Sequence, residues 1–166
     1  MKERILIFLL LFSFTFSVSA QTEGARKSAE ARLIENFGTY NCEDIKSRLI
    51  ILHLALSEEP KSKGIVIVYE GKYAKYVDAR NGKSTIKYIL PSVGESIFRT
   101  REMQDILVFF KFPMENFLFI DGGFRENFEV ELWVVPNDAK MPKPTPTLET
   151  MKYRKGAPMK TVCGGS

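Results

Sequence analysis

The sequence is poor in the side chains that build metal and redox sites, since it holds one histidine, two cysteines and one tryptophan. His53 has no cysteine or histidine near it in the sequence, so we expect it to pack in or beside the core instead of binding a metal. We therefore predict neither a metal nor a cofactor. The chain also shows no residue pattern typical of a catalytic centre, no internal repeat and no nucleic-acid-binding signature.

The sequence also lacks an apolar run long enough to cross a bilayer, which takes about 20 residues. Its longest apolar run, 5–16, follows charged residues at 2–4 and precedes the small residues Val18-Ser19-Ala20. This order is typical of a cleaved signal peptide, so we expect 1–20 to be removed and the chain to be secreted or periplasmic. No cysteine follows the run, so no lipid anchor is expected. Removal of 1–20 would lower the formal net charge from +4 to +3.

The two cysteines are Cys42 and Cys163. Export would place them in an oxidising compartment, where they can form a disulfide that closes a loop of about 120 residues. The chain-entropy model gives such a bridge roughly 4 to 5 kcal/mol. Cys163 lies in a Gly-Gly-Ser ending that favours a free chain end, so the sequence leaves both the bridged and the free form open.

The length after the signal fits one domain, which we expect over 31–136. Residues 21–30 are polar without periodicity and predict a flexible arm. An insertion at 72–93, rich in Lys, Tyr and Gly, could be a hairpin or a loop. Residues 137–166 form a basic tail whose alternating prolines impose extended backbone, as in a linker or a clamp along the surface. Its basic segment 151–156 could dock on the domain or bind an acidic partner.

Two helices are predicted by apolar residues at helical spacing. Asn41 is a suitable N-cap for the first helix, which should bury Ile45, Leu49, Leu52 and Leu56 and end before Pro60. A second amphipathic helix is expected from Phe98 to Phe110, with Pro113 as its stop. Both helices should pack on a sheet.

Four strands are predicted at 32–38, 64–69, 117–120 and 128–135. The β-branched run 64–69 is typical of a central strand covered on both faces, and we expect it to end at Glu70-Gly71. The run 117–120 is also continuously apolar and predicts cover on both faces. In the last strand Phe128, Val130, Leu132 and Val134 alternate with polar residues, and Trp133 is expected to pack on the helix-covered face.

Asp121-Gly122-Gly123 predicts a tight turn, which would make the last two strands an antiparallel pair. The order strand, helix, strand, helix, strand, strand predicts a mixed α+β fold, with a mixed sheet and two helices packed against it. Helix crossovers should place parallel strands side by side.

Over 31–136 the sequence resembles the OmpA-like domain, the peptidoglycan-associating module of bacterial outer-membrane proteins. The segment 99–107, RTREMQDIL, is similar to the RAxxVxxYL helix of that family, and 127–132, NFEVEL, is similar to its NRRVEI strand. The chain resembles more closely a group of uncharacterised secreted bacterial proteins with GG[YF]RE and VELW motifs, at 122–126 and 130–133. The first resemblance implies an OmpA-like α/β fold.

In the OmpA-like family, an aspartate of a GHTD motif and the arginine of RAxxV hold the diaminopimelate of peptidoglycan by charge-paired hydrogen bonds. The resemblance implies that Arg99 stands at the place of the arginine. Lys72 occupies the place of the aspartate, and Glu70 is the nearest substitute carboxylate. Asp121 and Arg125, beside the two glycines, complete the predicted ligand-binding set.

We therefore predict a non-enzymatic binding module of the cell envelope, whose partner is peptidoglycan or an envelope protein. One alternative is a structural protein–protein interaction module that docks through Trp133 and the proline tail. A second is a hydrolase built on Asp121, Glu129 and Glu131 with Arg125, because glycosidase chemistry needs two carboxylates. No nucleic-acid partner and no membrane span after signal removal are expected. The oligomeric state is open.

Overall fold

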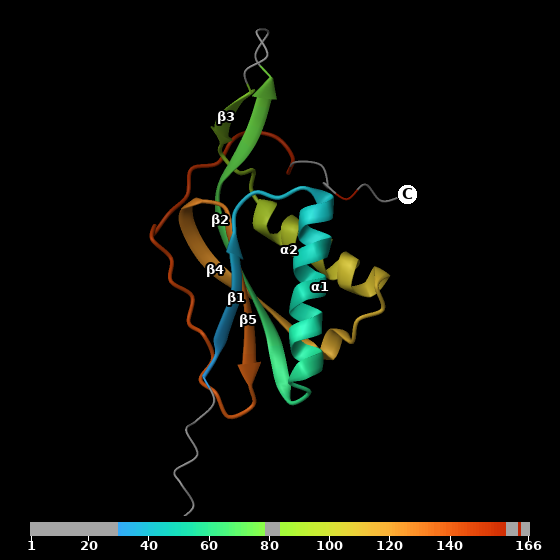
Figure 1. Ribbon diagram of the computed structural model, residues 1–166. Helices are drawn as coiled ribbons and strands as arrows, with labels where there is room; N and C mark the ends of the chain where they lie inside the picture. The colour runs from blue at the N-terminus through green and yellow to red at the C-terminus, as the bar shows by residue number, and fades with distance from the viewer. Residues whose placement is uncertain (1–29, 79–83, 159–162, 164–166) are drawn as a thin grey trace, which may run out of the picture.

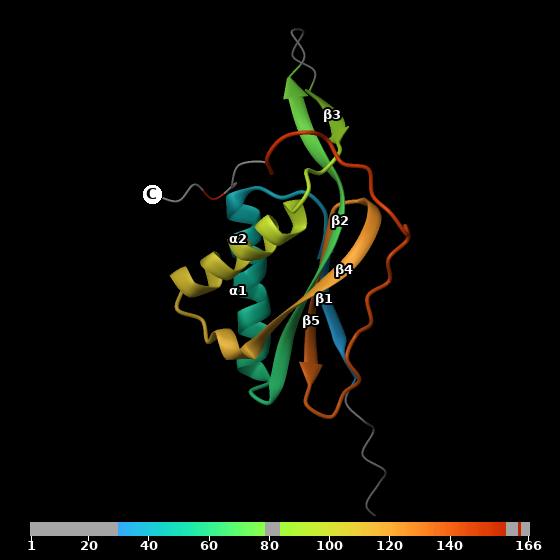
Figure 2. The ribbon, with the colours of Figure 1, turned by 180° about the vertical axis from the view of Figure 1, so that it is seen from behind.

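The computed structural model describes residues 30–78, 84–158 and 163. The elements are β1 (Arg32–Phe37), α1 (Cys42–Glu58), β2 (Ser62–Asp78), β3 (Ser84–Ile89), α2 (Glu95–Phe109), the 3-10 turn η1 (Met114–Asn116), β4 (Phe117–Asn127) and β5 (Glu129–Pro136). Both helices lie on one face of the sheet, and the chain after β5 runs along the other side (Figure 1, Figure 2). The predicted signal and most of the predicted arm lie outside the described residues. Within those residues, no helix is long and apolar enough to span a membrane.

Strand β2 is the centre of the sheet. It pairs parallel with β4 on one side and antiparallel with β5 on the other, while β5 also pairs antiparallel with β1. The mixed α+β architecture with two helices is thus confirmed. The predicted antiparallel pair of β4 with β5 is wrong, because β5 lies between β1 and β2 and β4 lies on the far side of β2. A central strand forms hydrogen bonds on both of its sides, so two strands that follow one another in sequence can pair with it on opposite sides.

The predicted turn at Asp121-Gly122-Gly123 is a bulge inside β4, which continues to Asn127. The step from Asp121 to Phe124 on β4 pairs with the shorter step from Val68 to Glu70 on β2. Gly123 has φ of 78°, and an added Cβ at Gly122 would collide with the Tyr69 ring. Glycine suits a bulge as well as a turn, so the same residues fit both structures.

Strand β2 does not end at Glu70-Gly71, as predicted, but continues to Asp78. Gly71 is needed because the backbone of Asn127 passes where a side chain would lie. The last part of β2 pairs antiparallel with β3, from Tyr73↔Ile89 onward. The insertion is therefore the hairpin alternative, and it projects from the body of the domain (Figure 1).

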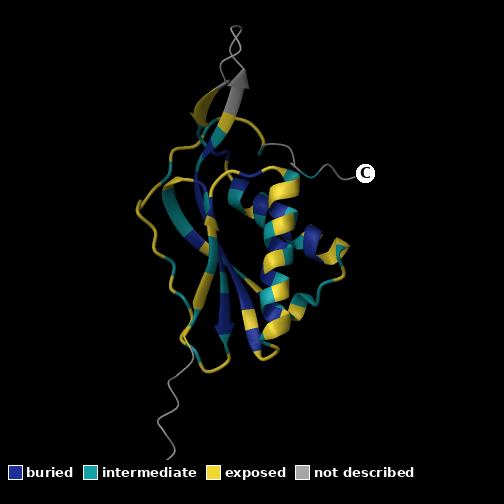
Figure 3. Cartoon of the chain, viewed as in Figure 1, coloured by how far each residue is buried: buried dark blue, intermediate teal, exposed yellow. Residues whose placement is uncertain are grey.

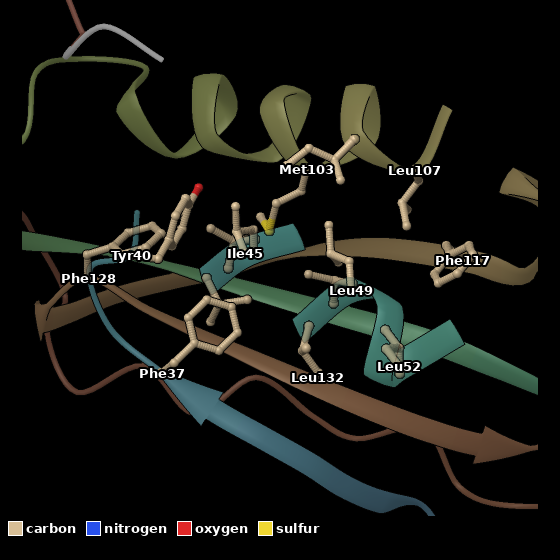
Figure 4. Packing of buried hydrophobic residues seen from close by; sticks show 14 of the residues in the cluster. Phe37, Tyr40, Ile45, Leu49, Leu52, Met103, Leu107, Phe117, Phe128 and Leu132 are labelled. Carbon is tan, nitrogen blue, oxygen red and sulfur yellow. The ribbon is translucent and has the colours of Figure 1, made fainter. Parts of the chain in front are cut away.

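The main core lies between the helices and the sheet. Asn41 caps α1, since its Oδ1 accepts a hydrogen bond of 3.0 Å from the Asp44 N–H. The buried side chains of α1, α2 and β5 face one another (Figure 4). They include the residues predicted for the first helix and the last strand, and Phe128, which directly precedes β5, is buried with them: Ile45, Leu49, Leu52, Leu56, Phe128, Val130, Leu132 and Val134. His53 is half-buried and stacks on Phe112, with ring centroids 3.9 Å apart, which fits the packing role expected of it.

A second, smaller cluster covers the helix-free face of the sheet. Ile65, Ile67, Tyr69 and Val135 are its buried members, and Trp133 and Ala139 pack against it. The expectation that Trp133 faces the helices is therefore wrong. Residues at even positions of β5 face the helices, so strand alternation turns Trp133 to the opposite face. Both faces of β2 are covered, as its β-branched run predicts.

The chain from 137 to 157, here called the strap, provides the cover on that face. The Thr145 N–H donates to the Tyr69 hydroxyl over 3.1 Å, and Leu148 pairs with Phe124 of β4. Further along, the Arg154 N–H donates to the Pro91 carbonyl over 2.9 Å. The strap is therefore a clamp, and its basic segment docks on the domain.

Cys42 and Cys163 form a disulfide, with their Cα atoms 4.8 Å apart and a separation of 121 in sequence. Cys42 is the first residue of α1. The bridge thus ties the chain beyond the strap to the start of the first helix.

Strand β4 is one edge of the sheet, and its exposure differs from the prediction. The side chain of Phe117 is buried, but Leu118 is 48% exposed and Phe119 and Ile120 are only half-buried. The run 117–120 was expected to be covered on both faces, which is wrong for Leu118. An apolar run is typical of buried strands, but it does not reveal whether the strand has a neighbour on each side. The buried strands lie toward the centre of the sheet (Figure 3).

Candidate functional site: a cleft between α2 and β4

Arg99, the predicted ligand arginine, lies in the core of the domain. It is 3% exposed, and its guanidinium donates to two carboxylates of its own helix. Nη1 lies 3.0 Å from Glu102 Oε2, and Nη2 lies 3.3 Å from Glu95 Oε1. A ligand could reach Arg99 only by displacing both. The structure therefore gives Arg99 the role of an internal cation.

The two glutamates are buried with Arg99 and have further partners. The Tyr40 hydroxyl donates to Glu102 over 3.2 Å, and the Cys163 N–H donates to the same carboxylate over 3.1 Å. Arg154 of the strap reaches Glu95 at 3.7 Å. Burial raises the pKa of Tyr40 well above its usual value, and the charge of Glu102 raises it further. The cluster thus holds the strap, the disulfide end and α2 together.

Glu70 and Lys72 are also engaged within the protein. Glu70 is buried and accepts hydrogen bonds from the Ser96 N–H at 3.3 Å and the Tyr153 hydroxyl at 2.8 Å. Burial and the bond to Glu70 raise the pKa of Tyr153 to about 12. Lys72 Nζ lies 3.3 Å from Glu126. Both side chains thus have partners within the protein, and neither forms an ion pair with Arg99 in the described structure.

Arg125 lies on the helix-free face of the sheet, beneath the strap. Its guanidinium pairs with Glu129 at 2.7 Å and Glu131 at 2.8 Å, and its central carbon lies 3.4 Å from the centre of the Tyr69 ring. It also donates to Thr145 Oγ1 of the strap at 2.6 Å. The carboxylates of the hydrolase alternative are thus divided: two are neutralised by Arg125, and Asp121 lies elsewhere. Arg125 thereby links Glu129 and Glu131 to the strap.

Trp133, the residue on which the docking alternative is built, belongs to the same group of side chains. The Trp133 indole N–H donates to Glu131 over 3.0 Å, and the ring packs against the cluster that the strap covers. Trp133 thus packs within the chain, while Met141 and Leu148 of the tail are 45% and 41% exposed.

Asp121 is exposed and lines a cleft between α2 and β4. The cleft has a volume of about 260 Å³. Its walls are one side of α2, the first half of β4 and Val68 of β2. Its lining residues are Val68, Ser96, Ile97, Thr100, Arg101, Gln104, Phe119, Ile120 and Asp121. Of the predicted ligand residues, Asp121 alone lines it.

Arg101 is the cation of the cleft and is not among the predicted ligand residues. It is exposed on α2 and forms no ion pair with any residue that the structure describes. Asp121 accepts a hydrogen bond from the Gly123 N–H at 2.9 Å and is not paired with a cation in the described part of the chain. The cleft therefore presents one cation and one anion, with the hydroxyls of Ser96 and Thr100 near them. Such a site can hold a ligand that carries both charges.

The helical periodicity of the buried residues on α2 could have identified Arg101 from the sequence. Arg99 lies four residues before Met103 and seven before Ile106, so it shares their buried face. Arg101 lies two residues further on, which is about 200° around a helix. The match of Arg99 to a family motif outweighed this periodicity in the prediction.

Comparisons of the chain with family models, curated proteins and solved structures found no match. The OmpA-like resemblance therefore stays a prediction. Among the residues described, no group of three or more His, Cys, Asp or Glu side chains could hold a metal ion.

Proposed function

We propose that the protein is a non-enzymatic binding module of the bacterial cell envelope. Its α2–β4 cleft takes a peptide ligand that carries both a carboxylate and an ammonium group. The observation that carries this proposal is the presence of Arg101 and Asp121 in one cleft, with opposite charge and without an ion pair between them. In this proposal a leader at 1–20 is cleaved and the chain is secreted or periplasmic.

The two charges suit a peptide ligand. Arg101 would donate to the carboxylate and Asp121 would accept from the ammonium group, each charge-assisted hydrogen bond contributing roughly 1.5 to 3 kcal/mol. Ser96, Thr100 and Gln104 add neutral hydrogen-bonding groups to the same cleft. Two such bonds correspond to weak binding by a small ligand, around millimolar in Kd, unless further contacts are made.

Peptidoglycan and envelope proteins both offer this chemistry. The diaminopimelate of a peptidoglycan stem has carboxylates and an amine, and a polypeptide has acidic and basic side chains. In either case the proposal assigns the ligand arginine to Arg101 instead of Arg99, because Arg99 is paired with Glu95 and Glu102. No cofactor takes part in the proposed binding.

The test is co-sedimentation of the chain from residue 21 onward with purified peptidoglycan. We expect Arg101→Ala and Asp121→Ala each to reduce retention about tenfold, in line with the loss of one charge-assisted hydrogen bond. Asp105→Ala on α2 and Lys46→Ala on α1 are matched controls, because both residues lie outside the cleft. Retention that is equal in all four variants and in wild type would contradict the cleft as the binding site. If wild type is not retained at all, peptidoglycan is excluded and the envelope-protein partner is tested as described next.

A further inference from the structure

We propose that the outer edge of β4, over Phe117–Asp121, binds an extended polypeptide segment of an envelope protein by strand addition. Alternate side chains of the added segment would enter the α2–β4 cleft. The inference rests on the proposed function because it uses the same cleft, and it names the partner class. Strand addition gives affinity through main-chain hydrogen bonds and specificity through the pockets beside the strand.

The two edges of the sheet differ in how they are protected against added strands. Edge strand β1 carries Arg32 and Glu35, and its pairing with β5 is interrupted by a bulge between Leu33 and Glu35. Such charges and bulges discourage pairing with another chain. The first half of β4 is Phe-Leu-Phe-Ile, with no charge before Asp121, and it pairs regularly with β2 from Gly64↔Phe117 to Val68↔Asp121.

The outer side of this half of β4 has no strand beside it in the described part of the chain. In an edge strand, the N–H and C=O groups of every second residue point away from the sheet. These groups are therefore available to a new strand. Leu118, which points to the helix-free side, is 48% exposed. The edge is therefore apolar, regular and accessible.

The cleft runs along this edge. Phe119 packs against the helix-covered core and Ile120 against the cluster on the opposite face, yet both line the cleft. A cleft that lies at the edge of a strand can be lined by side chains from both faces of that strand. A segment added to β4 would thus lie beside α2.

The protein already uses this edge for an extended segment of its own. Beyond the bulge, the Thr147 and Leu148 N–H groups of the strap donate to the Phe124 carbonyl, at 2.9 Å and 3.1 Å. Leu148 forms an antiparallel bridge with Phe124. The uncovered half of β4 continues the same line, so an extended segment is the occupant that fits. The volume of about 260 Å³ accommodates a few side chains and not a folded domain.

The residues that line the cleft determine which side chains the bound segment should carry. Arg101 selects an acidic residue, and Asp121 selects a lysine or arginine. Ile97 is 59% exposed on the α2 wall and offers an apolar contact in the same cleft. We therefore expect a β-forming segment with one acidic and one basic residue on the side that faces α2.

The test uses short synthetic peptides in which valine alternates with threonine, with one glutamate and one lysine placed on the same face in either order. A control peptide replaces every second residue with proline, which cannot donate a main-chain hydrogen bond. Peptide affinity and hydrogen exchange of the amides in 117–121 are measured together. We expect binding of the alternating peptides, slower exchange at alternate amides of this range, and no binding of the proline peptide.

Two variants separate strand addition from charge pairing. Leu118→Lys places a charge on the open edge but not in the cleft, and Leu33→Lys places one on β1 at a residue of similar exposure, 44% against 48%. We expect Leu118→Lys to weaken peptide binding about tenfold and Leu33→Lys to leave it unchanged. Arg101→Ala should weaken it as well.

Each other result overturns the inference. It fails if none of the alternating peptides binds, if the proline peptide binds equally well, or if Leu118→Lys and Leu33→Lys behave alike. A dimer of the free protein that Leu118→Lys dissociates would assign the edge to a second copy of the chain instead. If peptides fail while peptidoglycan retention still depends on Arg101 and Asp121, the inference is wrong and the proposed function stands.

Discussion

Arg99 and Arg101 lie two residues apart on α2 and have opposite surroundings. Arg99 is 3% exposed and pairs with two buried glutamates, whereas Arg101 is exposed and lines the cleft without an ion pair in the described structure. Two steps along a helix turn a side chain to nearly the opposite side. The position of an arginine in a motif therefore says less about its role than its phase relative to the buried residues of its own helix.

The largest effect that tests this contrast is expected for Arg99→Ala. The change leaves Glu95 and Glu102 buried without the cation between them, so we expect a loss of about 3–5 kcal/mol in the free energy of unfolding. Arg101→Ala should change it by less than about 0.5 kcal/mol, because the side chain is exposed. Urea denaturation of both variants measures the difference. Equal losses would show that the two arginines do not differ in role.

A loss of about 2–5 kcal/mol is expected when the disulfide is removed by changing both Cys42 and Cys163 to serine. The bridge closes a long loop and holds the Cys163 N–H against Glu102. The variant should therefore unfold at lower urea concentration. The Arg101-dependent binding should persist in the folded fraction, since the cleft contains neither cysteine. Unchanged stability would mean that the bridge contributes nothing beyond the packing of the strap.

A smaller effect is expected for the two tyrosines that surround Arg99. The Tyr40 hydroxyl donates to Glu102, whereas the buried Tyr73 hydroxyl has no hydrogen-bond partner among the described residues. Tyr40→Phe should cost about 1 kcal/mol, and Tyr73→Phe should be neutral or stabilising, because it removes a buried polar group that lacks a partner. Thermal unfolding compares the pair. A larger loss in Tyr73→Phe would contradict this assignment.

The same tyrosines predict how stability changes with pH. Burial is the main cause that raises the pKa of both side chains above the ordinary value of 10.0. Because the pKa of each tyrosine is higher in the folded protein than in the unfolded chain, the two side chains stabilise the folded state below pH 10. This contribution is lost as pH rises above 10. The free energy of unfolding should therefore fall on the alkaline side. The fall should be less steep in the two phenylalanine variants.

A stabilising effect is expected at the end of the helix that carries both arginines. Lys111 follows α2 with φ of 58°, while the Phe112 N–H donates to Leu107 O and the Lys111 N–H to Val108 O. This is a Schellman ending, where glycine is favoured. Lys111→Gly should stabilise the protein by about 1 kcal/mol, because glycine adopts positive φ without strain. Lys111→Ala, which keeps the strain, is the control for loss of the lysine side chain.

Local patterns in the sequence predict much of the fold. Three elements can be recognised from a short stretch of sequence, and all three occur as predicted: the capped, amphipathic α1, the β-branched centre of β2 and the alternating β5. The partners of β4 and β5 could not be predicted in the same way. Strand pairing depends on contacts between distant residues, and Asp121-Gly122-Gly123 suits a turn and a bulge equally.

The candidate site was predicted less well than the fold. Asp121 was selected for its place beside two glycines, and it does line the cleft. Arg99 was selected by motif, although its spacing from Met103 places it on the buried face of α2. The sequence left docking of the basic segment 151–156 open. Because the strap carries no periodic pattern, the sequence did not reveal that Tyr153 would bond to Glu70 and Arg154 would pair with Glu95.

The most direct test of the account is a map of backbone amide chemical shifts during titration with the alternating peptide and then with a diaminopimelate-containing muropeptide. The account predicts that the largest changes fall on 96–104 of α2 and 117–121 of β4, and that Arg101→Ala removes them. Changes confined to the β2–β3 hairpin or to the strap, with the cleft unaffected by either ligand, would contradict it.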